Sequence, residues 1–109
     1  MPNYKFIVLS RAVEGREDEY NDWYQNTHLR EIVGIPGVVG AQRFRLAQQL
    51  SGEAPAQYLA IYELESEDLQ GFVMEMLRRA GSGEITVSPA MVENPQAVIY
   101  EEFGARVTP

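Results

Sequence analysis

Apolar residues alternate with other side chains in four stretches of this 109-residue chain, and in two further stretches they recur every three or four residues. Alternation is the pattern of a β-strand, whereas the longer spacing indicates an amphipathic helix. The alternation predicts strands at residues 4–11, 38–46, 57–64 and 97–103. The helical spacing predicts one helix from the acidic segment 14–19 to Gly34 and a second helix from Ser66 to Gly81.

The predicted helix ends follow from residues that favour them. Acidic residues at 17–19 suit the positive end of the first helix. Gly34 is expected to close that helix in the left-handed conformation, and Pro36 prevents its continuation. Ser66 is expected to cap the second helix, and Gly81 is expected to end it.

The predicted order of elements is βαββαβ, without repeats or internal linkers, so residues 1–109 are expected to form a single domain. This order is typical of the α+β, ferredoxin-like arrangement, in which two helices cover one face of a four-stranded antiparallel sheet. The other, open face would carry side chains such as Arg43, Tyr58, Tyr62 or Tyr100. That face is too apolar to remain in water, and we expect a second copy of the chain to cover it, which gives a homodimer.

A long connection separates the second helix from the last strand. Residues 81–95 exceed what a compact domain needs, and they are expected to hold a short helical turn or to act as a flap.

Composition and charge exclude several classes of function. A formal net charge of −7 disfavours binding to nucleic acids and to anionic membranes, whose phosphates attract lysine and arginine. The chain has no cysteine and a single histidine, and it lacks phosphate-binding and calcium-binding loops, so neither a metal nor a cofactor is expected. No apolar run is long enough to span a membrane, and the N-terminus lacks the features of a signal peptide. A cytoplasmic location is therefore expected.

The chemistry of the chain is concentrated at residues 20–31, YNDWYQNTHLRE, which hold its only tryptophan, its only histidine and two of its six tyrosines. In a helix of about 100° per residue, Asn21 and His28 would lie along the edge of one stripe. The stripe itself would carry Tyr20, Trp23, Tyr24, Thr27 and Glu31. A stripe that mixes aromatic rings with a carboxylate and an imidazole needs polar partners when it is buried. Either a polar cavity faces it, or part of it lies in water.

His28 is the candidate general acid or base, because histidine is the side chain whose ordinary pKa lies near neutral pH. A single histidine on a helix edge is equally consistent with a structural role. Tyr24 lies one turn earlier, so its phenol and the imidazole could bind the same substrate. Trp23 could form an aromatic wall or fill the contact between helix and sheet. Glu31 could orient His28 or lie exposed.

The strands offer further candidates. Arg43 could bind a carboxylate or an enolate, or it could pair with a neighbouring carboxylate such as Glu63 or Glu102. Tyr58 and Tyr62 are open to the same two interpretations, as binding groups or as packing.

The order of residues in this part of the chain resembles that of a known superfamily. The matching positions are Asn21-Asp22-Trp23-Tyr24, His28-Leu29, Glu31, Ile35-Pro36-Gly37-Val38 and Arg43-Phe44. They resemble the dimeric α+β barrel superfamily, and within it the EthD-like group. The resemblance implies two ferredoxin-like subunits packed sheet against sheet, with a pocket in each subunit between the sheet and the helices or loops. Members of the superfamily include cofactor-independent monooxygenases, muconolactone-type isomerases, polyketide cyclases and haem-degrading enzymes, so the fold does not choose a reaction.

By position, the resemblance points to pocket residues in the first helix. We take His28 and Tyr24 as the candidate catalytic pair. The substrate-binding candidates are Trp23, Asn21, Arg43, Tyr62 and Glu31. Haem-degrading relatives carry their haem-ligating histidine on the second helix, where this chain has none, so haem is not expected.

Three functions fit this pattern. The leading hypothesis is a homodimeric enzyme that performs cofactor-independent proton transfer, as an isomerase or cyclase, on a hydrophobic cyclic or enolisable substrate. The first alternative is a cofactor-independent monooxygenase of phenols or quinols, and the second is a non-catalytic ligand-binding or accessory protein. The RNA recognition motif shares the βαββαβ order, but its aromatic strand signature is replaced here by QYLAIYEL.

Overall fold

Four strands form a single antiparallel sheet in the computed structural model, which describes residues 1–109. The order of strands in the sheet is β2-β3-β1-β4, and every pairing is antiparallel. The strands lie close to the predicted positions: β1 (Asn3–Ser10), β2 (Val38–Arg45), β3 (Tyr58–Glu65) and β4 (Gln96–Glu101).

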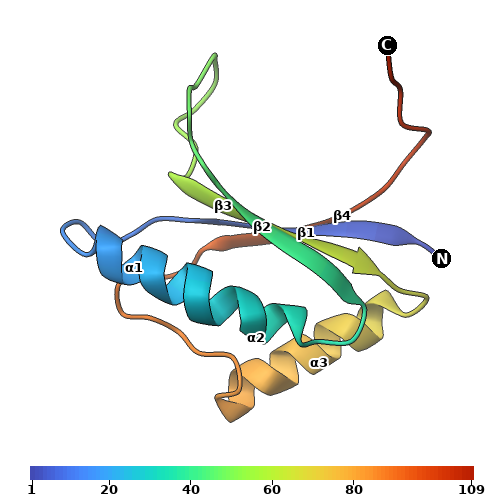
Figure 1. Cartoon of the computed structure of the whole chain (residues 1–109), viewed down its shortest axis with the longest axis horizontal. Helices are drawn as coiled ribbons and strands as arrows, with labels where there is room; N and C mark the ends of the chain where they lie inside the picture. The colour runs from blue at the N-terminus through green and yellow to red at the C-terminus, as the bar shows by residue number, and fades with distance from the viewer.

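The helices lie together on one face of this sheet (Figure 1). The segment between β1 and β2 holds α1 (Glu17–Trp23), the π-helical turn η1 (Tyr24–His28) and α2 (Leu29–Val33), which follow one another without a break. The second helical segment is α3 (Leu69–Ser82). The predicted order and the ferredoxin-like α+β fold are therefore confirmed.

The first helical segment is not the uniform α-helix that the spacing predicted. In η1 the Leu29 N–H donates to the Tyr24 carbonyl, a five-residue step that makes this turn wider than an α turn. Tyr24 and Leu29 are both buried, so the buried face shifts by one position across the turn. Thr27 is exposed, so part of the predicted stripe lies in water, which is one of the two alternatives. His28 is partly buried instead.

Two of the expected caps also differ. Gly34 keeps a right-handed conformation with φ of −69°. Gly37 takes the positive φ, 100°, and a Cβ there would lie 3.0 Å from the Leu64 side chain.

Asp68 caps α3, since its Oδ1 accepts a hydrogen bond from the Gly71 N–H at 2.9 Å. Ser66, the predicted cap, precedes the helix and accepts a hydrogen bond from the Asp68 N–H.

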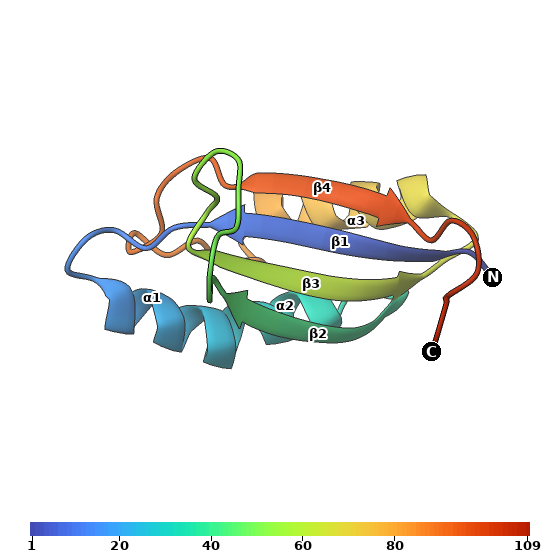
Figure 2. The same cartoon turned by 90° about the horizontal axis from the view of Figure 1, so that it is seen from above.

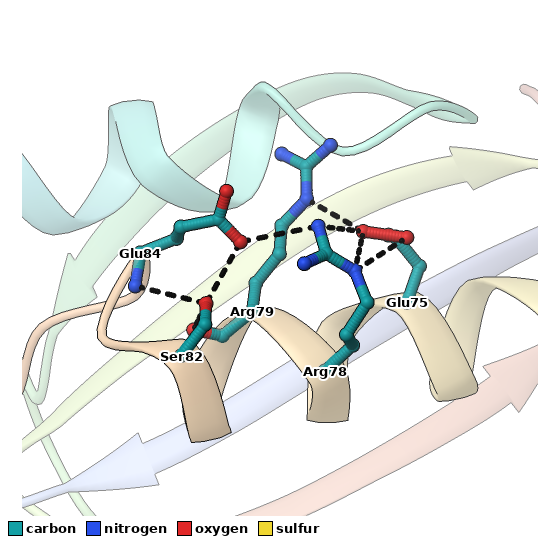
Figure 3. A network of polar contacts seen from close by, with 5 residues as sticks. All are labelled: Glu75, Arg78, Arg79, Ser82 and Glu84. Atoms are coloured by element: carbon teal, nitrogen blue, oxygen red, sulfur yellow. Dashed lines mark hydrogen bonds and ion pairs between the residues drawn. The ribbon is translucent and has the colours of Figure 1, made fainter.

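The C-terminal end of α3 extends past Gly81, where the sequence predicted its end, to Ser82. A network of ion pairs and hydrogen bonds stabilises this end, and it joins five side chains (Figure 3): Glu75, Arg78, Arg79, Ser82 and Glu84. Hydrogen bonds from Arg78 and Arg79 hold the pKa of the Glu75 carboxyl below its usual value.

The strand register decides which side chains face the helices. Tyr62 lies opposite Phe6 and Ala41, and Arg43 lies opposite Ala60. Opposite residues share a face of a sheet, and Phe6, Ala60 and Tyr62 are buried. This row therefore forms the helix-covered face.

Arg43, Tyr58 and Tyr62 thus lie beneath the helices, and the expectation that they belong to the open face was wrong. Both faces of the central strands are apolar, and it is the row rich in aromatic rings that packs under the helices. Tyr100 lies opposite Lys5 on the open face, as expected. The open face carries seven apolar side chains, Ile7, Leu9, Phe44, Leu59, Ile61, Val98 and Tyr100, and the polar side chains of Lys5, Gln42, Glu63 and Gln96 share it.

Two segments extend from the sheet on the side away from the helices (Figure 1). One is the connection 46–57 between β2 and β3, and the other is the C-terminal segment 102–109. Both carry exposed apolar side chains, among them Leu50, 89% exposed, and Phe103, 100% exposed. Figure 2 shows the open face toward the viewer, with the helices behind the sheet.

Candidate functional site

His28 lies in η1, among two aromatic rings and a carboxylate. Its imidazole stacks on Trp23, with ring centroids 4.5 Å apart. It meets the Tyr24 ring nearly at right angles, with centroids 5.0 Å apart. Its Nδ1 atom lies 3.1 Å from Oε1 of Glu31, and the two side chains are only 15% and 14% exposed. Three of the predicted site residues therefore surround His28.

Thr86, from the connection between α3 and β4, fixes this group. Its backbone N–H donates to both carboxylate oxygens of Glu31, at 3.1 and 3.2 Å, and its hydroxyl donates to Oε1 at 3.0 Å. The same hydroxyl accepts a hydrogen bond from the indole N–H of Trp23 at 3.0 Å. Sequence reasoning missed Thr86, and the unusual length of residues 81–95 is the one signal that pointed to this segment.

The connection that carries Thr86 is anchored to the core on both sides of it. Ile85, Ser88 and Ala90 are buried, and the Val13 N–H donates to the Ala90 carbonyl at 2.7 Å. The connection holds no helical turn after α3 ends, so that alternative was wrong. The backbone at Thr86 is therefore held in place by its neighbours in the connection.

The Glu31 carboxylate sets the state of the His28 ring. An ionised carboxylate only accepts hydrogen bonds, so the shared proton lies on Nδ1, and Nε2 carries a free lone pair. Nε2 has no hydrogen-bond partner in the protein and is not fully buried. Burial lowers the pKa of His28 below its ordinary value, and the Glu31 carboxylate opposes this shift. The imidazole is thus neutral near pH 7 and presents Nε2 as a proton acceptor.

Tyr24 and Tyr62 form a second feature of the site, because the hydroxyl groups of both are buried without a hydrogen-bond partner. The two phenols influence each other's pKa, but their geometry falls outside that of a hydrogen bond. Burial raises the pKa of Tyr24 to about 12, and it raises the pKa of Tyr62 as well. Both hydroxyls are therefore protonated donors at neutral pH. The contact between Tyr24 and His28 joins the two rings rather than the hydroxyl and the imidazole.

Arg43 also contacts Tyr24. Its guanidinium carbon lies 4.8 Å from the centroid of the Tyr24 ring, and 5.4 and 5.5 Å from those of Tyr20 and Tyr58. Nη2 of Arg43 donates to Oδ1 of Asn21 at 2.7 Å, and Nη1 donates to the Asn21 carbonyl oxygen at 3.5 Å. Three tyrosine rings and one asparagine therefore hold the guanidinium in place.

A groove of about 540 Å³ runs between α1 and β2, and its lining residues are Asn21, Asp22, Gln25, Arg43, Phe44, Arg45 and Tyr58. Of the predicted site residues, only Asn21 and Arg43 line it. The others line neither this groove nor the other main pockets.

The structure therefore brings the predicted residues together in two groups. One is His28 with Trp23 and Glu31, and the other is Arg43 with Asn21. The Tyr24 ring contacts both groups. Tyr62 is buried in the core close to Tyr24.

No model of a known family and no curated protein matches the sequence. Solved structures, in contrast, match along nearly the whole chain. An EthD-family protein from Bacillus halodurans gives a TM-score of 0.61 at 17% identity, over 94% of this chain and 100% of that one. The chain has the fold of that family.

Two further structures support the same conclusion. A candidate antibiotic biosynthesis monooxygenase from Bordetella bronchiseptica has a TM-score of 0.64 at 16% identity, over 94% of this chain and 99% of that one. A dimeric ferredoxin-like protein of unknown function from Thermobifida fusca has a TM-score of 0.57 at 16% identity, over 91% and 90% of the two chains. The resemblance to EthD-like proteins is thereby confirmed for the fold, and a shared fold leaves the reaction open.

Two further properties bear on the site. No group of three or more histidine, aspartate and glutamate side chains is arranged to hold a metal ion. No helix combines the length and the apolar character needed to cross a lipid bilayer.

Proposed function

We propose that this protein is a small-molecule enzyme that performs proton transfer without a cofactor, as an isomerase or cyclase does. The observation that supports this function best is the His28–Glu31 pair. It combines a partly buried imidazole, a carboxylate bonded to its Nδ1 and an Nε2 atom free of protein partners. A base of this kind is most effective when its pKa lies near the working pH.

In the proposed reaction, Nε2 of His28 takes a proton from a carbon next to a carbonyl group of the substrate. The electron pair of that C–H bond forms a new C=C bond, and the π pair of the carbonyl group moves to its oxygen. In a substrate with a further C=C bond in conjugation, this gives a dienolate, whose negative charge is shared with a more distant carbon. The imidazolium, stabilised by Glu31 through Nδ1–H, then returns the proton to a different carbon of the same molecule. General acid–base catalysis of this kind contributes about 10² to 10⁴-fold to the rate.

The surrounding residues fit a hydrophobic cyclic or enolisable substrate. Trp23 would form an aromatic wall next to His28, against which its ring is stacked. Arg43 and Asn21 would stabilise negative charge on the substrate. Tyr24 and Tyr62 would supply hydroxyl donors, since both are protonated and neither is used by the protein.

A cofactor-independent monooxygenase is the second candidate, and the fold shared with a candidate antibiotic biosynthesis monooxygenase favours it. The same base would remove a proton from a phenol or quinol, and the resulting carbanion would react with O₂. One oxygen atom would enter the ring as a carbonyl group, and the other would leave as water. Oxygen consumption with a panel of hydroquinones separates this reaction from isomerisation.

A non-catalytic binding protein is the third candidate. It is favoured by the position of His28, which lines none of the main pockets. Tight binding of a ligand without turnover is its signature.

The proposed enzyme is a homodimer formed through the open face of the sheet. The apolar side chains of this face have no covering element in a single chain, and a second copy would remove them from water. The dimeric ferredoxin-like protein from Thermobifida fusca shares the fold. Segments 46–57 and 102–109 extend toward the same side and would contact the second copy.

Hydrogen exchange tests the proposed chemistry directly. Cyclic ketones and unsaturated lactones in deuterated water should exchange their acidic carbon-bound hydrogens faster with the protein than without it. The His28→Gln variant should lose this acceleration, whereas the exposed-residue control Thr27→Ala should keep it. Equal acceleration by His28→Gln and by the unaltered protein would exclude His28 as the base.

A further inference from the structure

Arg43 stands apart from the other arginines of the chain. It is partly buried, as are Arg16 and Arg79. Arg16 is paired with Glu19 and Arg79 is paired with a carboxylate of its own helix, but Arg43 forms no ion pair. The expected alternative, a salt bridge from Arg43 to a strand carboxylate, was therefore wrong. A cation that has lost part of its hydration without gaining a counter-ion is costly unless a ligand supplies one.

The guanidinium of Arg43 is nevertheless held firmly. A guanidinium has five N–H donors, and Asn21 accepts hydrogen bonds from two of its nitrogen atoms. The rings of Tyr20, Tyr24 and Tyr58 fix its position. The remaining donors have no acceptor in the protein, although arginine is the side chain best suited to bind a carboxylate through two parallel hydrogen bonds.

The groove next to Arg43 has the size of a ligand site. Its volume of about 540 Å³ lies within the range of small-molecule pockets. Arg45, which also forms no ion pair, lines the same groove, and Tyr58, on the same face of the sheet as Arg43 and Arg45, adds aromatic surface. One carboxylate, that of the exposed Asp22, is also on the lining, and it accepts a hydrogen bond from the Asn26 amide.

We propose that this groove binds a planar organic anion, a carboxylate carried on an aromatic or conjugated ring. Arg43 would hold the carboxylate through two N–H donors, Arg45 would add positive charge at the rim, and the ring would lie against Tyr58. The inference rests on the proposed function and deepens it, because it names the class of substrate.

The arrangement also relates the anion site to the proposed base. The guanidinium carbon of Arg43 is 4.8 Å from the Tyr24 ring, and the imidazole of His28 is 5.0 Å from the same ring. The two groups are therefore separated by no more than the sum of these distances. The anion site and the proposed base thus share the buried Tyr24 ring as a common neighbour.

Binding of benzoate, with benzamide as a neutral molecule of the same shape, tests the proposal. Titration calorimetry and the NMR signal of the Arg43 Nε–H would report binding. Benzoate should bind at least about 10-fold more tightly than benzamide and should shift the Arg43 signal, because a bidentate charged pair replaces a neutral contact. Equal affinity for the two compounds, or benzoate binding that leaves the Arg43 signal unchanged, would overturn the proposal.

Variants show whether benzoate binding needs the two parallel N–H donors of the Arg43 guanidinium or only its positive charge. Arg43→Lys keeps the positive charge and loses the planar fork, so benzoate should bind about 10-fold more weakly. A substitution of Arg43 also alters its packing among three tyrosine rings. Variants of the exposed residues Arg45 and Asp22 at the rim of the groove provide a test that does not disturb the core. Arg45→Gln should weaken benzoate binding about 3-fold, and Asp22→Asn should strengthen it about 3-fold, as expected for exposed charges near the ligand. Unchanged affinity in both rim variants would place the anion elsewhere.

His28→Gln distinguishes failure of this inference from failure of the proposed function. It should bind benzoate like the unaltered protein and should lose proton exchange. Benzoate binding that depends on Arg43 in a protein without any exchange activity would keep the anion site and reject the proposed base. If exchange depends on His28 but the protein binds benzoate no more tightly than benzamide, the proposed base is kept and the anion site is rejected.

Discussion

Glu31 and Thr86 are 55 residues apart in the sequence, yet three hydrogen bonds join them. These bonds connect the end of the first helical segment to the long connection before β4. Because Glu31 also accepts the Nδ1 proton of His28, the connection 83–95 takes part in orienting the imidazole. In many functional sites a carboxylate orients a histidine ring, and a further residue in turn holds that carboxylate in place. The length of this connection therefore has a structural reason.

Replacement of Thr86 by valine should weaken this arrangement. Valine keeps the shape of threonine and the backbone N–H, but it removes the hydroxyl that bonds Glu31 and Trp23. We expect a loss of about 1 kcal/mol in the free energy of unfolding, because two hydrogen bonds are lost at an exposed position. Urea denaturation followed by fluorescence of the single tryptophan measures the change.

Thr86→Ser is the matched control for this prediction, because serine restores the hydroxyl. It should recover most of the lost stability. If Thr86→Val and Thr86→Ser are equally stable, the hydroxyl contributes nothing and the backbone N–H alone holds Glu31.

The single histidine allows its pKa to be measured by NMR without assignment of other rings. Burial should place the midpoint of His28 below the ordinary value of about 6.5. Glu31 raises the pKa of His28 through its hydrogen bond and its charge, so Glu31→Gln should lower the midpoint further. A midpoint at or above the ordinary value, or an increase in Glu31→Gln, would contradict the geometry of the pair.

The same shift predicts how stability depends on pH. Because the pKa of His28 is lower in the folded state, the unfolded chain takes up a proton first as the pH falls. The contribution of His28 is therefore complete above about pH 6.5 and declines below it, until the pH passes the folded pKa. The difference in unfolding free energy between the unaltered protein and His28→Gln should shrink over this range. A difference that stays constant from about pH 7.5 to 5 would show that His28 has the same pKa in both states.

The buried tyrosines should respond differently to loss of their hydroxyl groups. The hydroxyls of Tyr24 and Tyr62 have no partner, and an unsatisfied buried polar group costs about 1–3 kcal/mol. Tyr24→Phe and Tyr62→Phe should therefore stabilise the fold, or leave it unchanged. Tyr20→Phe is the contrasting variant, because the Tyr20 hydroxyl bonds the buried Ser10. It should destabilise the fold by about 1–2 kcal/mol.

Thermal unfolding of the three phenylalanine variants measures this contrast. A loss of stability in Tyr24→Phe as large as that in Tyr20→Phe would mean that the Tyr24 hydroxyl has a bound partner in solution.

The sequence was sufficient to predict the strands and their order, because alternation and turn residues are local properties. It also predicted the His28–Glu31 contact as one possibility, since residues three apart lie on neighbouring positions of a helix. The choice of sheet face was not predictable in the same way. Consecutive residues of β1 such as Phe6 and Ile7, which point to opposite faces of the sheet, are both apolar, so either face could have packed under the helices.

Other features depend on contacts that no local pattern records. The π turn that exposes Thr27 and partly buries His28 is a shift of one residue within an otherwise helical sequence. The role of Thr86 depends on a contact with Glu31 across the fold. A single threonine in a long connection carries no signal of such a contact.

The open face of the sheet provides the last prediction, which concerns assembly. Ile61 lies on this face opposite Ile7, in the middle of the aliphatic row. If two copies pack face to face, a charge at this position must be buried without a partner, which an interface tolerates poorly. Ile61→Lys should therefore be a monomer, while the unaltered protein should be a dimer at micromolar concentration.

Met74→Lys is the matched control for Ile61→Lys, because Met74 is an apolar residue that is 65% exposed on α3, on the opposite side of the sheet. It introduces the same charge and should leave the dimer intact. Light scattering measures the mass of all three proteins. A monomeric unaltered protein would reject face-to-face packing altogether, whereas dissociation by Met74→Lys but not by Ile61→Lys would place the interface on the helices. Only loss of the dimer in Ile61→Lys alone would assign the interface to the open face, where segments 46–57 and 102–109 would then reach the second copy.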